Sequence, residues 1–432
     1  MQLIRLAWRN FSRHLNRYRV LLLALTIVVA VLIIVLGAVT GMQETLRDKA
    51  SRYFAGNVVV FGYMDGGESL IEDPEGVDAL LDQAGVSEIA RSWRSTHYDP
   101  ANTNMFHAGY YMPQRRYVGV EWERERPMLE RFDFVDGGVP DAGDERGVLI
   151  STIAAEELRA SVGDELIVST TTDGGATNTV PLEVRGIFRE STFFGYIAYL
   201  ERGVLNRLLD RDEDRVNEIG MYFDGGAAEE TRVAESVNRA LSSEFPTFPV
   251  IETREQNSAE RSASRDERHY GSITLSAQLA QVNDILEAMT LIAGGIIALF
   301  LLLVVIGVSN TFSMVIFERT REIGTLRAMG MTKPRTVVLF LLEAFFLGAA
   351  GVVLGSLLGV GVLELVSRGV SFAGVPGFAE LFLRAERLQW SLTAGSFALV
   401  AAMAVLAGVA GSFRAALRAA RVSPVRALRL ET

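Results

Sequence analysis

Four long apolar stretches divide the chain. They lie within Val20 to Gln43, Ala288 to Phe317, Thr336 to Leu363 and Leu388 to Phe413. Each is longer than the about 20 residues that an α-helix needs to cross roughly 30 Å of hydrocarbon. Glu343, in the third stretch, is the one ionisable residue in all four. The pattern therefore predicts four membrane-spanning helices, at residues 20–43, 288–317, 336–363 and 388–413.

The polar stretch between the first two predicted spans is long enough to form a domain. Runs of β-forming residues alternate there with turn residues, and two stretches follow the helical period. We therefore predict a mixed α/β domain at residues 44–270, inserted between the first and second membrane helices. Strands are expected at 57–62, 116–121, 147–151, 165–171, 179–188 and 217–223, and helices at 153–161 and 227–245.

Apolar residues with heptad spacing lead from this domain into the second span, and no Gly or Pro interrupts them. Such spacing is typical of two helices that pack along a seam. We predict a stalk helix at 271–287 that pairs with the end of the first span and carries motion of the spans to the inserted domain. A spacer without a mechanical role is the alternative. The stalk residues are Met42, Leu46, Leu275, Leu279, Val282 and Leu286.

Basic residues are concentrated in three short segments. Lys and Arg outnumber Asp and Glu by 5 to 0 in residues 1–19, 5 to 2 in 318–335 and 5 to 1 in 414–432. Short segments of this kind remain in the cytosol. The loop 364–387 is balanced at 3 to 3, and residues 42–287 hold 24 basic against 45 acidic residues. We therefore expect a multi-pass protein of the cytoplasmic (inner) membrane, with both termini cytosolic and the inserted domain outside.

The first basic segment also has an apolar face. Ile4, Trp8, Phe11 and Leu15 repeat with helical spacing between the arginines of residues 1–19. A helix of this composition lies on the anionic surface of the inner leaflet. Membrane lipid is thus an expected partner of the N-terminal segment.

The sequence lacks the residues and motifs that are common in enzyme active sites. The chain has no cysteine and four scattered histidines, and neither an H-E-x-x-H nor a G-x-S-x-G motif occurs. No lysine follows a glycine, so the phosphate loop G-x-x-x-x-G-K is absent. The net charge of −10 argues against a nucleic-acid partner. We expect no catalytic residue, metal or directly bound cofactor, and hence no enzyme.

Two segments near the C-terminus resemble a known family. Residues 318–335 read E-R-T-R-E-I-G-T-L-R-A-M-G-M-T-K-P-R, and residues 419–429 read A-A-R-V-S-P-V-R-A-L-R. Together with the glycines of the third span, they resemble the permeases of the ABC transporter group that includes MacB, LolC, LolE and FtsX. In the insert, residues 147–151, 162–166 and 184–188 are similar to the periplasmic core of that group.

The resemblance implies that the energy source is another polypeptide. In this group a cytosolic ATPase dimer, which holds ATP and Mg, docks beneath two permease chains that are identical or different. The resemblance places the ATPase-coupling segment at 318–335, between the second and third spans. The residues implied to contact the ATPase are Glu318, Arg319, Arg321, Glu322 and Arg327.

Two features of the third span call for close packing. Gly351, Gly355 and Gly359 form small-xxx-small steps that let two helices approach. Their partner is either another helix of this chain or a second permease chain. Glu343 is costly in lipid, and we expect a structural role for it, satisfied by Arg335 or by the membrane interface.

Among the functions of the group, the sequence favours release of lipoproteins from the inner membrane. Only 19 residues precede the first span, whereas MacB carries its nucleotide-binding domain fused there, so a separate ATPase is expected. One alternative is MacB-like export of a peptide, antibiotic or other amphiphile through a periplasmic adaptor. Another is FtsX-like regulation of an extracytoplasmic enzyme.

Overall fold

The computed structural model describes residues 2–13, 15–64, 68–190, 194, 196–372, 377–384 and 386–422. They form two compact units. The membrane unit comprises Met1–Glu44, Leu286–Phe372 and Arg387–Thr432, and the inserted domain comprises Thr45–Ile285 and Ala373–Glu386. Each unit has hydrophobic cores of its own.

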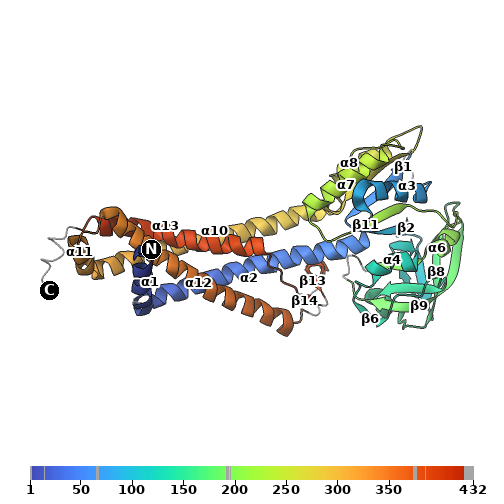
Figure 1. Cartoon of the computed structure of the whole chain (residues 1–432). Coiled ribbons are helices and arrows are strands. Elements are labelled where there is room, and N and C mark those ends of the chain that lie inside the picture. The colour runs from blue at the N-terminus through green and yellow to red at the C-terminus, as the bar shows by residue number, and fades with distance from the viewer. Residues whose placement is uncertain are drawn as a thin grey trace. The chain divides into compact units, whose positions relative to one another are not determined.

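Long helices build the membrane unit, and four stretches in the described residues are long and apolar enough to cross a membrane: Tyr18–Tyr53, Ile285–Glu318, Lys333–Gly369 and Ala394–Ala420. The prediction of four membrane helices with a mixed α/β domain between the first two is confirmed (Figure 1). The helices are α1 (Gln2–Arg13), α2 (Leu15–Tyr53), α10 (Ala280–Glu318), α11 (Thr320–Ala328), α12 (Lys333–Gly369) and α13 (Ala394–Ala420).

Several helix ends differ from the expected bounds. Helix α1 covers Gln2–Arg13 and α2 begins at Leu15, so residues 15–19 of the predicted N-terminal segment belong to the same helix as the first membrane span. The last helix starts at Ala394 instead of residue 388, because the Thr393 hydroxyl accepts a hydrogen bond from Ser396 N at 3.1 Å and caps it. Helix α13 also continues past residue 413 into the expected tail, whose residues 423–432 lie outside the described part of the chain.

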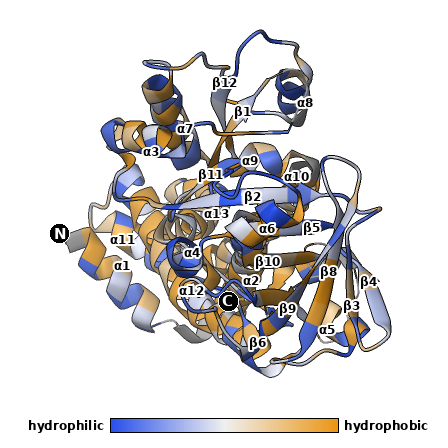
Figure 2. Cartoon of the chain, turned by 90° about the vertical axis from the view of Figure 1, so that its right-hand side faces the viewer, coloured by the Kyte–Doolittle hydropathy of each residue, from blue (hydrophilic) through white to orange (hydrophobic). Residues whose placement is uncertain are grey.

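Hydrophilic and hydrophobic residues alternate along the ribbon of α1 (Figure 2). Phe11 is buried in the membrane unit and lies beside Trp8, which also meets Phe346 of α12 edge-on, with ring centroids 5.2 Å apart. Trp8 and Ile4 are both 54% exposed. The apolar face of α1 is therefore shared between α12 and the surroundings of the protein.

The inserted domain is built on one mixed sheet. Its strand order in the described residues is β12-β1-β11-β2-β5-β10-β7-β9-β8-β3-β4, with β6 also paired to β9. The pairs β5–β10 and β7–β9 are parallel, and the other pairs are antiparallel. The strands are β1 (Val58–Tyr63), β2 (Ala90–Tyr98), β3 (Asn104–His107), β4 (Tyr110–Pro113), β5 (Arg116–Val120), β6 (Phe134–Gly137), β7 (Gly147–Ser151), β8 (Glu165–Thr171), β9 (Thr177–Phe188), β10 (Ile197–Glu201), β11 (Glu218–Tyr222) and β12 (His269–Thr274).

Short helices cover the sheet, and their apolar faces form its cores. Helix α7 buries Val233, Val237 and Leu241 at helical spacing against residues of β1, β2 and β11. Helices α5 and α6 contribute to a second core with β7 to β10. The helices are α3 (Pro74–Leu81), α4 (Trp122–Leu129), α5 (Thr152–Leu158), α6 (Arg202–Leu208), α7 (Ala227–Leu241), α8 (Arg254–Ser262) and α9 (Leu275–Gln278).

The expected stalk helix begins later than residue 271. Residues 269–274 form β12, which pairs with β1 along its whole length. Helix α9 then covers only Leu275–Gln278, and α10 starts at Ala280. Heptad spacing could not reveal this break, because Leu279 keeps its buried position while its backbone, at φ −81° and ψ 5°, leaves the helical conformation.

Candidate functional site

Helix α11 is the short helix between the second and third membrane helices. It buries Ile323 and Gly324 against the rest of the membrane unit. Gly330, with φ of +98°, ends the helical stretch in a left-handed conformation that favours glycine. Pro334 then lies in the first turn of α12, where its missing N–H costs nothing. The turn chemistry in the sequence thus builds a compact helical hairpin here.

A groove with apolar side chains and about as much polar surface lies beside α11 in the membrane unit and has a volume of about 610 Å³. Met329, which is 71% exposed, projects at its edge. The groove is lined by two residues of α1, by the end of α11 and by the start of α12: Leu3, Leu6, Leu326, Met329, Gly330, Met331 and Arg335. This surface is suited to receive apolar side chains of another molecule next to the charged face of α11.

A buried ion pair fixes the start of α11. Arg319 directly precedes α11, and its Nη1 donates to both carboxylate oxygens of Glu343 in α12, at 2.9 and 3.2 Å. Its Nε donates to Glu322 Oε2 at 2.7 Å, which ties it to α11 itself. The side chains of Arg319 and Glu343 are 3% and 0% exposed. Breaking such a buried pair is strongly destabilising, because it leaves one charge uncompensated.

The Glu343 carboxylate also accepts hydrogen bonds from two further helices, α1 and α2. Tyr18 Oη of α2 donates to Oε2 at 3.1 Å, and Asn10 Nδ2 of α1 donates to Oε1 at 3.0 Å. Arg335, the partner expected from the sequence, is exposed, so Arg319 takes its place. The sequence does not indicate that Asn10 and Tyr18 contact Glu343, because more than 300 positions separate them from it. The intramembrane carboxylate was the signal that a partner must exist.

The five residues expected to contact an ATPase are not equivalent. Glu318, Arg321 and Glu322 are exposed on or next to α11. Arg327 is half-buried and donates to the carbonyl of Val422, which follows α13. Arg319 is turned inward to Glu343, because a carboxylate buried among apolar helices requires a cation beside it. Arg319 therefore positions α11 instead of presenting a surface contact.

The glycines of α12 face α2. A Cβ added at Gly351 would lie 2.9 Å from Leu25 Cβ, and one at Gly355 would lie 2.6 Å from Val29 Cβ. At Gly359 the nearest atoms belong to Ala30 and Ile33. Of the two partners left open by the sequence, the structure therefore places a helix of the same chain against this glycine face.

The expected stalk residues are divided between the two units. Leu46, Leu275, Leu279 and Val282 are buried in the inserted domain. Met42 and Leu286 belong to the membrane unit and are half-buried. Side-chain hydrogen bonds join α2 to α9 and to α10. Arg47 Nη1 donates to Ser276 Oγ of α9 at 3.2 Å in the inserted domain, and Gln43 Nε2 donates to Thr290 Oγ1 of α10 at 3.2 Å in the membrane unit.

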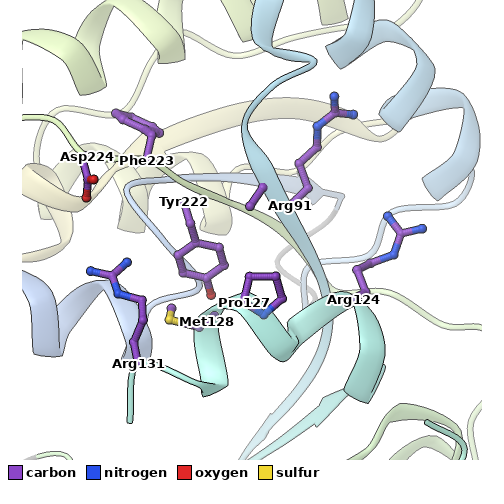
Figure 3. Close-up of a pocket in the computed structure, with 9 residues that line it drawn as sticks. Arg91, Arg124, Pro127, Met128, Arg131, Tyr222, Phe223 and Asp224 are labelled. Carbon is purple, nitrogen blue, oxygen red and sulfur yellow. The ribbon is translucent and has the colours of Figure 1, made fainter.

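A pocket of about 210 Å³ in the inserted domain is rich in arginine. Figure 3 shows Arg91, Arg124 and Arg131 around Tyr222 and Met128. Each arginine already has an acidic partner, so the positive charge is largely neutralised. The pairs are Arg91 with Asp78 and Asp82, Arg124 with Asp78 and Glu121, and Arg131 with Asp48. The pocket is therefore not preassembled for an anion.

Two family models match different parts of the chain. Residues 20–240, more than half of the chain, match the MacB-like periplasmic core domain. Residues 294–424 match the FtsX-like permease C-terminal family, and this region includes α11 and Glu343.

Similar proteins fall in the same class. The "Pyoverdine export ATP-binding/permease protein PvdT" of Pseudomonas syringae pv. syringae is 26% identical over 99% of this chain. This chain spans 59% of the length of that protein. The "Uncharacterized ABC transporter permease YknZ" of Bacillus subtilis is 23% identical, over 99% of this chain and 98% of its own length.

A third relative and one solved structure match smaller parts. The "Uncharacterized ABC transporter permease MJ1507" of Methanocaldococcus jannaschii is 32% identical over 37% of this chain and 38% of its own length. The periplasmic region of MacB from Actinobacillus actinomycetemcomitans matches 53% of this chain and 94% of its own length, at 8% identity and a TM-score of 0.31. On the family matches, this chain belongs to the ABC transporter permeases of the MacB and FtsX type.

Proposed function

We propose that this chain is a permease subunit that receives movement from a separate ATPase on α11 and passes it to the inserted domain. The observation that carries the proposal is the buried link between Arg319 and Glu343. It joins the start of an exposed helix to α12, and through Tyr18 and Asn10 to α2 and α1. A push on α11 is therefore delivered to three other helices through hydrogen-bonded charges.

The docking surface in this proposal has a charged part and an apolar part. Arg321 and Glu322 supply exposed charges on α11, and the neighbouring groove with Met329 supplies an apolar recess. Interfaces commonly combine a desolvated apolar anchor with a polar rim. The ATPase would hold ATP and Mg, and it would act as a dimer beneath two permease chains.

We propose a location in the inner membrane, with both termini and α11 in the cytosol and the inserted domain outside. The excess of arginine near α1, α11 and the C-terminus supports this orientation, because such segments resist translocation. The amphipathic α1, with Trp8 and Ile4 exposed, fits the surface of the inner leaflet.

The proposed coupling serves one of two classes of cargo. Export of a small compound is supported by the PvdT relative, which is named as a pyoverdine export protein. Release of lipoproteins, which the sequence favours, requires the same coupling and a different cargo. A mass spectrum of the intact complex separates them: a bound triacylated protein supports lipoprotein release, and a bound small amphiphile or a co-purified periplasmic adaptor supports export. Activation of an extracytoplasmic hydrolase without cargo would instead support the FtsX-like role.

A charge reversal on α11 tests the ATPase interface. Arg321→Glu should abolish co-purification with the ATPase while the protein stays inserted, because the Arg321 side chain is exposed on α11. Arg414→Glu, on the exposed face of α13, is the matched control and should leave co-purification unchanged. Equal ATPase recovery with wild type and Arg321→Glu would refute the interface.

A further inference from the structure

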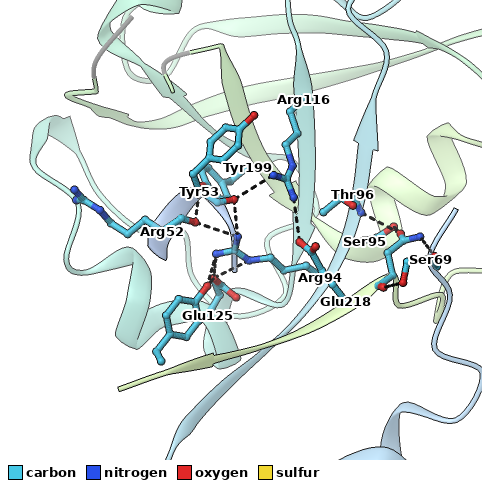
Figure 4. Close-up of polar contacts among 12 residues, drawn as sticks. Arg52, Tyr53, Ser69, Arg94, Ser95, Thr96, Arg116, Glu125, Tyr199 and Glu218 are labelled. Carbon is cyan, nitrogen blue, oxygen red and sulfur yellow. Dashed lines mark hydrogen bonds and ion pairs between the residues drawn. The ribbon is translucent and has the colours of Figure 1, made fainter. Parts of the chain in front are cut away.

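The C-terminal end of α2 is held in a buried cationic socket within the inserted domain. The last four carbonyl groups of an α-helix have no partner in the helix itself. Here Arg94 Nη1 donates to the carbonyl of Arg52 at 3.0 Å, and Arg116 Nη1 donates to that of Tyr53 at 3.2 Å. Figure 4 shows both guanidinium groups directed at the helix end. Their positive charge also complements the negative end of the helix dipole.

Both arginines are themselves fixed to the sheet. Arg94 lies on β2, is fully buried, and donates from Nε and Nη2 to Glu125 Oε1 at 3.1 and 2.5 Å. Arg116 lies on β5 and donates from Nη2 to Glu218 Oε1 at 3.1 Å. Strands β2 and β5 are neighbours, as are β2 and β11, the strand of Glu218. The end of α2 is therefore bonded to the middle of the sheet.

Arg94 keeps its positive charge in the buried socket. Burial by itself would lower the pKa of Arg94, but Glu125, Tyr222 and Tyr199 raise it above its ordinary value. Arg94 is therefore protonated near neutral pH, as arginine side chains generally are. The buried guanidinium of Arg94, which donates hydrogen bonds both to Glu125 and to the end of α2, links the two strongly and directionally, because charge-assisted hydrogen bonds are about twice as strong as neutral ones.

Two further side chains in the last turns of α2 are also tied down. Lys49 Nζ lies 3.3 Å from Glu190 Oε1, with both side chains less than 10% exposed. Arg52 Nη1 donates to the carbonyl of Arg131 at 3.0 Å, beyond α4. These contacts resist rotation of α2 about its own axis, which two bonds at its end would not do alone.

The chain leaves the inserted domain through α9 and α10, and this second connection to the membrane helices differs from α2. Strand β12 passes into α9, whose first turn is capped by the Thr274 hydroxyl, which accepts from Ala277 N at 3.2 Å. At Leu279 the backbone leaves the helix before α10 begins. Leu279 N still donates to Leu275 O at 2.9 Å, and Val282 N donates to Leu279 O at 2.7 Å, so the departure from helical geometry is confined to one residue.

We infer that α2 is the rigid lever of the inserted domain and that the α10 connection is jointed at Leu279. Arg94 and Arg116 are the positioning residues that clamp the lever. The inference rests on the proposed function, since it names the route by which movement of the membrane helices reaches the sheet. A tilt of α2 turns the sheet with it, while the joint lets α10 follow without straining β12.

Pairs of spin labels test the clamp on the full chain in lipid nanodiscs. The chain has no cysteine, so labels can be attached at chosen sites without background. The first pair is Glu44→Cys on α2 with Thr177→Cys on β9, and the second is Glu287→Cys on α10 with Thr177→Cys, all at exposed positions. We expect a narrow distance distribution for the first pair and a broader one for the second.

The decisive variant is Arg94→Lys with Arg116→Lys. Each lysine keeps the charge beside its glutamate but lacks the planar fork that reaches the glutamate and the helix carbonyl together. The first pair's distribution should broaden at least about twofold, because a single ammonium nitrogen replaces the several nitrogens with which the guanidinium reached the glutamate and the helix carbonyl together. Arg146→Lys with Arg207→Lys is the matched control: both arginines are ion-paired in the same domain, away from α2, and the width should not change.

The outcomes separate this inference from the proposed function. An unchanged width in the Arg94 and Arg116 variant, or equal widths for the two wild-type pairs, overturns the clamp. If the double variant does not fold, Arg116→Lys alone, at the edge of the socket, decides by the same criterion. Absence of any ATP-dependent shift in the second pair, measured in the wild-type complex with its ATPase, would contradict the proposed function and leave the clamp standing.

Discussion

Single residues in this chain matter most where charge is buried. Glu343 accepts hydrogen bonds from Arg319, Tyr18 and Asn10, which arrive from three other parts of the fold. A carboxylate among apolar helices is tolerated only with such partners. The same residue pair therefore supports the membrane unit and holds α11 in place, and the two roles can be separated by experiment.

Glu343→Leu should lower the stability of the membrane unit by about 3–5 kcal/mol, because Arg319 remains buried without its counter-charge. Adding Arg319→Met should restore most of that loss, since an apolar pair of similar volume needs no compensation. The double variant should nevertheless lose stimulation of ATP hydrolysis, because α11 is no longer bonded to α12. Thermal unfolding in detergent and ATPase assays of the complex give the two values. If the double variant hydrolyses ATP like wild type, the pair has no part in coupling.

We expect His97 to make the stability of the inserted domain depend on pH. Burial, followed by the nearby Arg211, lowers the pKa of His97 below its ordinary value of 6.5. The unfolded chain therefore binds the proton more readily than the folded one, and stability falls as the pH drops below about 6.5. Unfolding midpoints measured from pH 8 to 5 should decrease more for wild type than for His97→Gln. Parallel curves for the two proteins would show that His97 is not responsible.

At the scale of elements, close contacts between helices depend on the absence of side chains. Gly355 of α12 lies against Val29 and the carbonyl of Thr26 in α2, where a Cβ would come within 2.6 and 2.7 Å. Gly361 lies on the same helix, and no atom would lie within 4 Å of its Cβ. The two glycines thus share a helix and differ in their surroundings.

Gly355→Ala should destabilise the membrane unit by about 1–3 kcal/mol, as overpacking does when backbones must separate. Gly361→Ala should be neutral or stabilising by up to about 1 kcal/mol, because alanine is the better helix former. Thermal unfolding of the two variants side by side measures the difference. A destabilisation of similar size in both would mean that packing against α2 is not the cause.

At the scale of the whole molecule, the cores of the two units consist of different residues. The cores around Phe340 and Val352 belong to the membrane unit, whereas those around Val148 and Val237 belong to the inserted domain. Units with separate cores can unfold separately, because loss of one core leaves the other intact.

Urea unfolding in detergent should therefore proceed in two transitions. The first should involve the inserted domain, because its water-exposed sheet unfolds while the micelle still supports the apolar helices. Tryptophan fluorescence can distinguish them, since Trp93 and Trp122 lie in the inserted domain and Trp8 and Trp390 in the membrane unit. A single transition with all four tryptophans would contradict independent units.

Some of the fold follows from the sequence because the pattern is local. The four spans need only a long run of apolar residues, and β8 was predicted at its observed bounds from alternation over seven residues. Strands such as β3, β4 and β10 are not predicted from the sequence. They are short, and they are stabilised by pairing with neighbouring strands, which their own residue pattern does not reveal. Residues 271–274 of β12 fall in the predicted stalk helix, because a heptad pattern follows them directly.

The sequence by itself determined the membrane helices, the presence of an inserted α/β domain and the family resemblance, because these depend on residue order along short stretches. Only the tertiary structure decided that Arg319 faces Glu343 instead of a partner, and that Arg94 and Arg116 cap the end of α2. Both arrangements join residues far apart in the chain. Buried charges select their partners by three-dimensional proximity and the need for desolvated hydrogen bonds, which no linear spacing encodes.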